Sequence, residues 1–453
     1  MTTSKHKDVK TFPQGGIHPA DNKLSADSPI QSLPAPETAV IFLSQHIGAP
    51  AKPLVKVGDT VRAGQHIGEA DGFISANVHS SVSGTVQKIQ DVMDVSGYKK
   101  TAIVIKADGD EWADGIDRST GLNSEIKAEA EEIRKKVHDA GIVGLGGAAF
   151  PSHVKLAVPE GKTADVLLVN AVECEPYLTT DHRLMLEKAD EIIVGVRVAL
   201  KAIGIERAII GIESNKPDAI ALLTEKTMND PYIEVSPLKM QYPQGGERQL
   251  VKALAGKEIP PPPKGLPIDA GCVIFNVATI FAIYEAVQKN KPLFERVVCV
   301  TGKNVKNPGN FLCRVGTPIS ELIDAAGGMP DDTAKIVSGG PMMGKALTGT
   351  DIPTSKGVSG ILLFSEKDAH RAEILPCIRC GKCVQVCPLG LEPYLLMALS
   401  ERNLFDRAID EKIINCCECA CCSYICPSNR PLLDYIRFGK ATVIKKLKQR
   451  NAK

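Results

Sequence analysis

The sequence lacks long apolar runs and has almost no net charge. No stretch of its 453 residues approaches the roughly 18 apolar residues that a membrane-spanning helix requires. The formal net charge is +1, so nothing in the composition indicates a nucleic acid or another polyanion as partner. With 43% hydrophobic and 24% charged residues, the composition is that of a globular protein. The length predicts roughly three or four domains.

The N-terminal segment MTTSKHKDVKTFPQGGIHPADNK lacks an apolar stretch and carries both charge signs. Since a secretory signal needs an apolar core, the segment predicts no export, and we expect a cytoplasmic protein. A peripheral subunit needs no span of its own, so membrane association stays open.

Cysteine, by contrast, is concentrated near the C-terminus in two ladders with the spacing C-x2-C-x2-C-x3-C-P. This spacing is typical of proteins with two [4Fe-4S] clusters, in which the fourth cysteine of each ladder reaches the other cluster. The two predicted ligand sets are Cys377, Cys380, Cys383 and Cys426 for one cluster, and Cys416, Cys419, Cys422 and Cys387 for the other.

Zinc and disulfides are the alternatives for these cysteines. Zinc sites favour two separated C-x2-C pairs, often with histidine, and no histidine lies between Cys377 and the C-terminus. Disulfides need an oxidising compartment, which the N-terminus does not indicate. We therefore expect an electron carrier, with Cys417 and Cys421 as additional thiols outside the ladder register. Helical spacing of apolar residues between the ladders predicts a helical ferredoxin module.

Residues 40–107 alternate β-branched residues with glycine turns, which predicts a small β-sandwich. The stretch LVKVGDTVRAGQHIGEADGFISANVHSSVSGTVQKI resembles the biotinyl/lipoyl barrel. The register set by Gly84 puts Phe73 where those carriers have their modified lysine. Because phenylalanine has no amine to acylate, we expect a structural or docking module without a prosthetic group.

The central region alternates strands and helices and predicts an α/β layer. In GIVGLGGAAFPSHVKL, glycines let the backbone approach a ligand, and Lys155 is placed to neutralise a phosphate. The strand ADVLLVN ends at Asn170 and is followed at once by an acidic segment, which predicts a crevice at the carboxyl end of the sheet. The charged residues of that segment are Glu173, Glu175, Asp181 and Arg183.

Four motifs in order, GLGGAAFPSHVK, VNAVECEP, YPQGGE and NVAT, make this region similar to the flavin- and NADH-binding subunit of respiratory complex I. Together with GGIHP, the barrel, the segment TGKNVKNPGNFLCRVGTPISELI and the two ladders, nearly the whole chain resembles the C subunits of Rnf electron-transport complexes.

The resemblance implies an α/β multidomain fold. The implied domains are an N-terminal segment with a lipoyl-like barrel-sandwich (1–124), a Rossmann-like FMN- and NADH-binding α/β domain (125–295), a β-grasp module (296–365) and a C-terminal helical ferredoxin domain with two clusters (366–453). Within the β-grasp module we expect the loop SGGPMMG, residues 338–344, to lie near the clusters, and a plain hairpin is the alternative for it.

The resemblance also implies roles for individual residues. FMN would be bound by Gly144, Gly146, Gly147, Lys155, Asn170, Glu173, Asn276 and Thr279, and the turn of Gly245 and Gly246 would line the same site. NAD(H) would be contacted by Phe150 and by Glu175 and Glu247, which we expect to be catalytic. The chain departs from the family pattern at three acidic positions, which hold Val172, Gly246 and Ala278.

The implied function is that of the NAD-facing subunit of a membrane-bound ferredoxin:NAD oxidoreductase, peripheral on the cytoplasmic side. Hydride would pass between NAD(H) and FMN, and single electrons between FMN and the clusters. The implied partners are the other membrane and peripheral subunits of the Rnf complex, NAD(H) and, indirectly, ferredoxin. Two alternatives stay open: a soluble reductase of the cobalamin-reductase kind, and a cluster-bearing relay scaffold without flavin.

Overall fold

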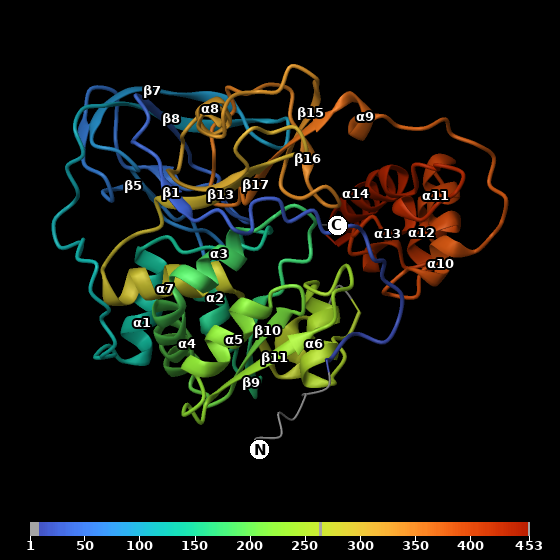
Figure 1. The fold of residues 1–453 in the computed structure, drawn as a ribbon, viewed down its shortest axis with the longest axis horizontal. Coiled ribbons are helices and arrows are strands. Elements are labelled where there is room, and N and C mark those ends of the chain that lie inside the picture. Colours follow the sequence, from blue (N-terminus) through green and yellow to red (C-terminus); the bar gives the residue numbers. More distant parts are fainter. Residues whose placement is uncertain (1–8, 262–264, 452–453) are drawn as a thin grey trace.

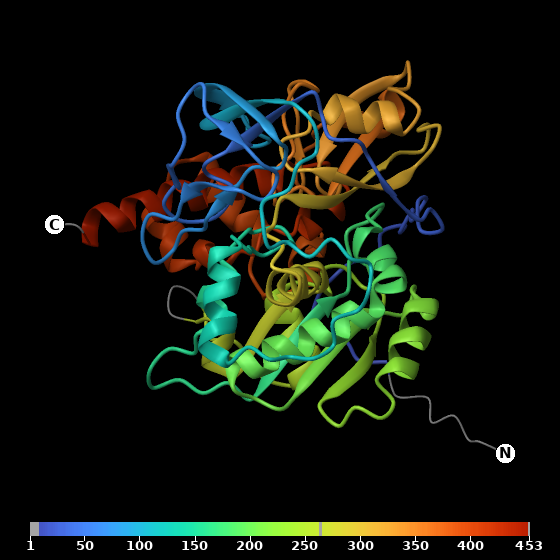
Figure 2. The same ribbon diagram turned by 90° about the vertical axis from the view of Figure 1, so that its left-hand side faces the viewer.

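The computed structural model describes residues 9–261 and 265–451; the first eight residues of the polar N-terminal segment lie outside these ranges. Figure 1 shows the barrel in blue, an α/β part in green below it, a second sheet in orange and a helical C-terminal part in red. In Figure 2 the barrel and the orange sheet lie side by side above the α/β part. No helix in the described ranges is both long enough and apolar enough to cross a bilayer.

The barrel is the β-sandwich that the glycine-punctuated alternation predicts. Antiparallel strands form one sheet in the order β2-β8-β7-β4 and another in the order β3-β5-β6. Their inward side chains, such as Ile41, Ile67 and Ile103, are fully buried, whereas Phe73 at the tip between β5 and β6 is 72% exposed. The strands are β2 (Thr38–Phe42), β3 (Lys52–Pro53), β4 (Thr60–Val61), β5 (His66–Glu69), β6 (Val78–His79), β7 (Gly84–Met93) and β8 (Lys99–Ala107).

The α/β part is built on a parallel sheet in the order β11-β10-β9-β12. Successive side chains of β9 face opposite sides of the sheet. Leu167 and Val169 pack with one group of helices, whereas Val166 and Leu168 pack with α6. Both faces are therefore covered, which explains the continuous apolar runs of the strands. The strands are β9 (Val166–Ala171), β10 (Ala208–Glu213), β11 (Ile233–Leu238) and β12 (Cys272–Asn276).

Helices α1, α4 and α7 cover the first face of this sheet, and α6 covers the second. Helix α4 ends at Gly204, whose φ of 82° is a left-handed C-cap. The helices are α1 (Ala130–Asp139), α2 (Ser152–Leu156), α3 (Thr180–Glu187), α4 (Ala189–Ile203), α5 (Pro217–Lys226), α6 (Glu247–Ala255), η1 (Pro267–Ala270) and α7 (Val277–Gln288).

The second sheet has the order β1-β14-β13-β17-β15-β16. Its edge strand β1 comes from the N-terminal segment and pairs in parallel with β14, with Ile30 opposite Asn310. Helix α8 packs on the sheet through Ile319, Leu322 and Ile323. The elements are β1 (Ile30–Ser32), β13 (Glu295–Thr301), β14 (Gly309–Arg314), α8 (Ile319–Ala325), β15 (Thr333–Ser338), β16 (Lys345–Ala346) and β17 (Gly360–Ser365).

The C-terminal part consists of short helices packed against the long helix α14. Its core combines leucines of α11 and α14 with ladder cysteines, so the predicted helical module is confirmed. The helices are α9 (Glu366–Ala369), α10 (Lys382–Gln385), α11 (Pro393–Glu401), α12 (Phe405–Asp410), η2 (Ile413–Asn415), α13 (Cys421–Tyr424) and α14 (Leu432–Asn451).

Lys356 connects the barrel, the α/β part and the second sheet. Its ammonium is buried and donates to the backbone oxygens of Asn77 at 2.9 Å and Gly141 at 2.7 Å. Burial lowers the pKa of Lys356 to about 7. This lysine is therefore easier to bury neutral than charged.

We expect the stability of the protein to rise with pH through this lysine. Between its folded pKa of about 7 and the ordinary lysine value of about 10.4, the unfolded chain holds a proton that the folded state does not. Each pH unit in that window raises the free energy of unfolding by about 1.4 kcal/mol. Urea unfolding at pH 7 and pH 9 should show a gain of about 2 kcal/mol in the wild type relative to Lys356→Met. The exposed-site control Lys99→Met should behave as wild type; equal pH dependence in all three proteins would contradict the assignment.

Candidate functional site

The glycine-rich turn between α1 and α2 is held from several sides. Gly144 N–H donates to the carbonyl of Phe150 at 2.8 Å, and Leu145 N–H donates to the Thr279 hydroxyl at 2.9 Å. The buried Arg296 guanidinium donates to the Leu145 carbonyl at 2.7 Å. These bonds fix the loop before any ligand binds.

The outer side of the same turn is open. A Cβ at Gly147 would have no atom within 4 Å, and its φ is +128°. A Cβ at Gly146 would lie 3.1 Å from the Cβ of Asn276. A side chain at Gly146 would press on Asn276, and one at Gly147 would be strained by the positive φ, whereas bare glycine backbone can be approached closely by a phosphate or a ring.

Two asparagines lie side by side at the carboxyl ends of neighbouring strands, because Asn276 of β12 is in register with Asn170 of β9. The Asn276 amide donates to the Asn170 carbonyl at 3.4 Å, and its oxygen caps α7 by accepting from Ala278 N–H at 3.0 Å. The Asn170 amide donates to the carbonyl of Gly245 at 2.9 Å. The strand end, the helix start and the turn before α6 therefore meet at this edge.

Lys155 and Glu247 reach the same edge from α2 and α6. The Lys155 ammonium lies 3.2 Å from the Glu247 carboxylate and 3.3 Å from the Ile274 carbonyl. Both side chains are partly exposed, and Glu247 follows Gly246 at the first position of α6. A cation and an anion thus stand at the rim of the open glycine turn.

Glu173 is hydrogen-bonded to the first turn of α3. Its carboxylate accepts from the backbone N–H of Asp181 at 2.8 Å and of His182 at 3.2 Å, and from the Thr180 hydroxyl at 3.2 Å. The side chain therefore caps the N-terminus of α3, where a negative charge is favourable. Its predicted contact with the ribityl chain of FMN stays a prediction.

Glu175 faces the loop of residues 338–344 in the second sheet. Its carboxylate accepts from the backbone N–H of Met342 at 3.0 Å and of Met343 at 2.9 Å, and from the Tyr242 hydroxyl at 3.4 Å. Burial raises the pKa of Glu175 to about 7, and these hydrogen bonds oppose the shift. Met342 packs near Cys419, so this loop lies beside the ladder cysteines, as expected from the sequence.

The second ladder and Cys387 of the first ladder surround one cavity in the helical part. The cavity is lined by Cys387, Cys416, Cys419 and Cys422, and also by Cys417 and Cys421. This grouping matches the predicted exchange of the fourth cysteine. In the other predicted set, burial raises the pKa of Cys383, and the nearby Cys426 raises it further. Cys377 and Cys380 of that set are exposed.

The thiols around this cavity are candidate ligands of an iron–sulfur cluster. No three His, Cys, Asp or Glu side chains within residues 9–261 and 265–451 are arranged to hold one metal ion. A [4Fe-4S] cube places each thiolate on a different iron, and Cys387, Cys416, Cys419 and Cys422 all line one cavity.

Comparison with known proteins shows the family of this chain. The RnfC barrel sandwich hybrid domain matches residues 10–110, the Nuo51 FMN-binding domain matches 137–285 and the SLBB domain matches 297–346. The C subunit of the Na(+)-translocating ferredoxin:NAD(+) oxidoreductase complex of Acetobacterium woodii is 44% identical over 97% of this chain and 98% of its own length. The chain belongs to the RnfC family.

Other relatives match this RnfC chain over similar lengths. The C subunit of the proton-translocating ferredoxin:NAD(+) oxidoreductase complex of Clostridium ljungdahlii is 43% identical over 96% of this chain and 94% of its own length. The C subunit of the ion-translocating oxidoreductase complex of Rhodobacter capsulatus is 40% identical over 94% of this chain and 82% of its own length.

Among solved structures, an NAD+-reducing [NiFe]-hydrogenase chain in the H2-reduced state is similar, with a TM-score of 0.50 and 18% identity. The match covers 71% of the RnfC chain and 61% of the hydrogenase chain. At this identity the likeness concerns the fold.

Sequence reasoning missed Arg296 and Tyr242. Arg296 is 4% exposed and joins the glycine turn to the second sheet by donating to the carbonyls of Leu145 and Val358. Its signal in the sequence was a charged residue within the apolar strand ERVVCVT. Tyr242 precedes the turn of Gly245 and packs against Cys419 and Cys421. The spacing of the motifs does not predict this packing.

Replacing Glu173 by alanine should destabilise RnfC through α3. The three hydrogen bonds to its carboxylate cap the helix, and losing such a cap costs about 1–2 kcal/mol. Chemical unfolding of Glu173→Ala against the exposed-site control Glu206→Ala measures this cost. Unchanged stability together with weakened FMN binding would instead give the carboxylate a role at the flavin.

Proposed function

We propose that this RnfC chain is the NAD-facing subunit of an ion-translocating ferredoxin:NAD oxidoreductase. Hydride passes between NAD(H) and FMN on the α/β part, and single electrons pass to or from two [4Fe-4S] clusters on the helical part. The observation that carries the proposal is a series of contacts that leads from one site to the other. Gly146 lies against Asn276, which is in register with Asn170. Asn170 donates to the Gly245 carbonyl, Gly245 N–H donates to Cys174 Sγ at 3.4 Å, and Cys174 packs against the buried cluster that contains Cys419 and Cys421.

The residues at the open edge have the chemistry of a flavin mononucleotide site. The glycine backbone at Gly144, Gly146 and Gly147 would lie against the flavin, with the N–H of Gly144 held by the Phe150 carbonyl, and Lys155 would neutralise the phosphate. The two asparagines, Thr279 and the turn of Gly245 and Gly246 would line the remainder. When bound, FMN supplies the exchange between two-electron and one-electron transfer that no side chain here provides. The protein contributes position, because hydride transfer between stacked rings depends on orientation.

For the nicotinamide nucleotide we propose contacts from Phe150, Glu247 and Glu175. Glu247 is favourably placed, because its partly exposed carboxylate lies beside the Lys155 ammonium at the rim of the site. Glu175 lies further towards the cysteines and is bonded to Met342 and Met343. Its contact with the nucleotide therefore requires that the loop of residues 338–344 lies at the same cleft.

The relatives are named as subunits of ion-translocating complexes. We infer that this chain assembles with the other membrane and peripheral subunits of such a complex and exchanges electrons that originate from or reach ferredoxin. We place it as a peripheral subunit on the cytoplasmic side of the membrane. The proposed domains are 1–124, 125–295, 296–365 and 366–453; the three family matches each fall within one of them, which supports the division.

The deciding experiment is anaerobic reconstitution with FMN, iron and sulfide, followed by titration with NADH. We expect the flavin absorbance to bleach and the cluster absorbance to fall with it. Lys155→Met should bind FMN about tenfold more weakly, since a hydrogen bond to a charged group is worth about 1.5–3 kcal/mol. Clusters without bound flavin in the wild type would contradict the proposal and favour the relay scaffold. A complete reaction by a protein that never associates with membranes would favour the soluble cobalamin-reductase kind.

Replacing one ladder cysteine should remove one cluster. Cys380→Ser should reduce the iron content from about eight to about four per chain, because each cube holds four irons. Cys417→Ser, whose thiol is outside the ladder register, is the matched control and should keep about eight irons. Iron and acid-labile sulfide assays measure both variants; full iron content in Cys380→Ser would overturn the ligand assignment.

A further inference from the structure

The GGIHP motif of the N-terminal segment forms a strap between the α/β part and the helical part. We use "the strap" for residues 15–19. In Figure 1 the blue N-terminal chain runs between the green and red parts of the molecule. Neither the barrel fold nor the flavin edge requires a segment at this place, so the position of the strap calls for its own explanation.

On one side, the strap is bonded to the chain that follows β11. Ile17 and Tyr242 exchange two backbone hydrogen bonds of 2.9 Å, one in each direction. The Gln241 side-chain amide donates to the Gly15 carbonyl at 2.7 Å. These residues lead directly into the turn of Gly245, which is bonded to Asn170 at the proposed flavin edge.

On the other side, the strap touches the first cysteine ladder. Gly16 N–H donates to the Val386 carbonyl at 2.9 Å, the residue before Cys387. A Cβ at Gly15 would lie 2.7 Å from the carbonyl carbon and oxygen of Cys387 and 2.8 Å from the nitrogen of Pro388. With a φ of +71° as well, this position accepts glycine and little else. The backbone contact thus reaches one of the cysteines that line the cavity.

Ile17 connects the α/β part and the helical part through apolar packing. It is 4% exposed and belongs to one buried cluster with Tyr242, Cys419 and Cys421. This buried hydrophobic cluster therefore contains a residue of the strap, a residue of the α/β part and two cysteines of the second ladder segment. The apolar packing leaves no room for the two parts to slide without opening a cavity.

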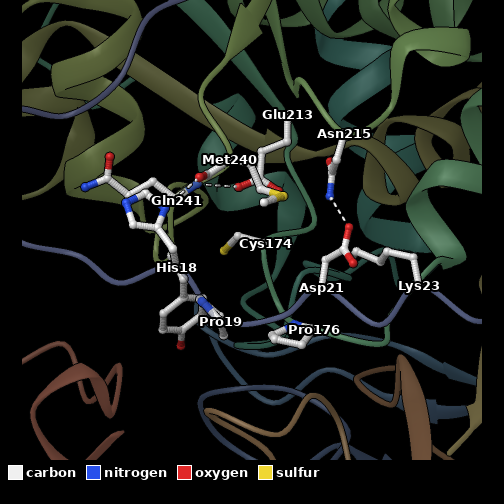
Figure 3. A pocket seen from close by; sticks show the side chains of 11 residues that line it. His18, Pro19, Asp21, Lys23, Cys174, Pro176, Glu213, Asn215, Met240 and Gln241 are labelled. Atoms are coloured by element: carbon white, nitrogen blue, oxygen red, sulfur yellow. Dashed lines mark hydrogen bonds between the residues drawn. The ribbon is translucent and has the colours of Figure 1, made fainter. Parts of the chain in front are cut away.

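The strap is anchored at both ends to the α/β part. Before it, Lys10 bridges to Leu238 at the end of β11. After it, the Lys23 ammonium donates to the carbonyls of Glu173, Glu175 and Leu178 at 2.6–3.0 Å. Figure 3 shows His18 and Pro19 across a small pocket from Glu213 and Asn215, with Cys174 between them.

We propose that the strap holds the cluster site of Cys387, Cys416, Cys419 and Cys422 at a fixed distance from the flavin edge. Gly15 and Ile17 are then positioning residues for electron transfer between the two sites. In that step a hydride from NADH would bring two electrons and one proton to the flavin; each of the two clusters would take one electron, and the proton would be released to solvent. Because transfer through protein slows steeply with distance, a shift of the helical part slows this step and leaves hydride transfer unchanged. The inference rests on the proposed function.

The test compares Gly15→Ala with Gly97→Ala in the reconstituted full-length protein. Gly97 lies in the turn between β7 and β8 with a φ of +80°, and no atom lies within 4 Å of its Cβ position. An alanine at Gly97 therefore carries the same strain from a positive φ as an alanine at Gly15, but it makes no clash with a neighbouring segment. In anaerobic stopped flow with NADH, we expect equal flavin bleaching in both variants. Cluster reduction in Gly15→Ala should be several-fold slower than in Gly97→Ala, because the clash at Gly15 displaces the backbone of Cys387 and lengthens the path for the electron.

A second readout does not depend on redox activity. Hydrogen exchange of the backbone around Val386 and Tyr242 should accelerate in Gly15→Ala and stay at the wild-type level in Gly97→Ala, with iron content unchanged in both. Ile17→Ala removes apolar packing without a backbone clash and should show the same changes to a smaller extent. If Gly15→Ala does not fold, Ile17→Ala takes its place in both measurements.

The outcomes separate the two proposals. Normal flavin bleaching with unchanged cluster reduction and unchanged exchange in Gly15→Ala and Ile17→Ala overturns the strap and leaves the proposed function intact. Absence of flavin bleaching in the wild type overturns the proposed function, and the exchange experiment still decides whether the strap holds the two parts together.

Discussion

The arrangement of the site depends on the buried guanidinium of Arg296. A buried charge is tolerated only when it is paired and hydrogen-bonded. Arg296 meets this need by donating to the carbonyls of Leu145 and Val358, and the Asp181 carboxylate lies close enough to favour its charged form. Asp181 in turn accepts from the Asn276 amide at 2.6 Å. One side chain of the second sheet therefore fixes the glycine turn and, through two neighbours, the asparagines at the strand ends.

Much of the fold could be predicted from local sequence patterns. The apolar runs of β9 and β10 and the glycine-punctuated barrel are local features with a fixed period, so a single sequence reveals them. The strand β1 could not be found in this way. It is only residues 30–32 long, and its partner is β14, so its pairing depends on a distant segment and on no pattern of its own.

The site shows the same division. The glycine turn, Lys155 and the asparagines could be singled out because they stand in short motifs whose order can be read from the sequence. Glu173 could also be singled out, but its hydrogen bonds to the first turn of α3 could not be predicted, since they depend on how the chain turns after β9. The crossed grouping of the cysteines is a prediction from their spacing, and Cys387 lines one cavity with cysteines of the second ladder. In the predicted grouping the two halves of the helical part depend on each other, because neither set of four thiols is complete within one ladder.

The pairing of β1 with β14 also bears on biosynthesis. Residues 30–32 leave the ribosome long before residues 309–314, so the N-terminal segment has no sheet to join while the barrel is already able to form. The strap can already bond to the chain after β11, which is made earlier, but β1 itself has no strand to pair with until β14 is made. Domains of this chain can thus fold one after another during translation, but their joining is a late event that waits for the last third of the polypeptide.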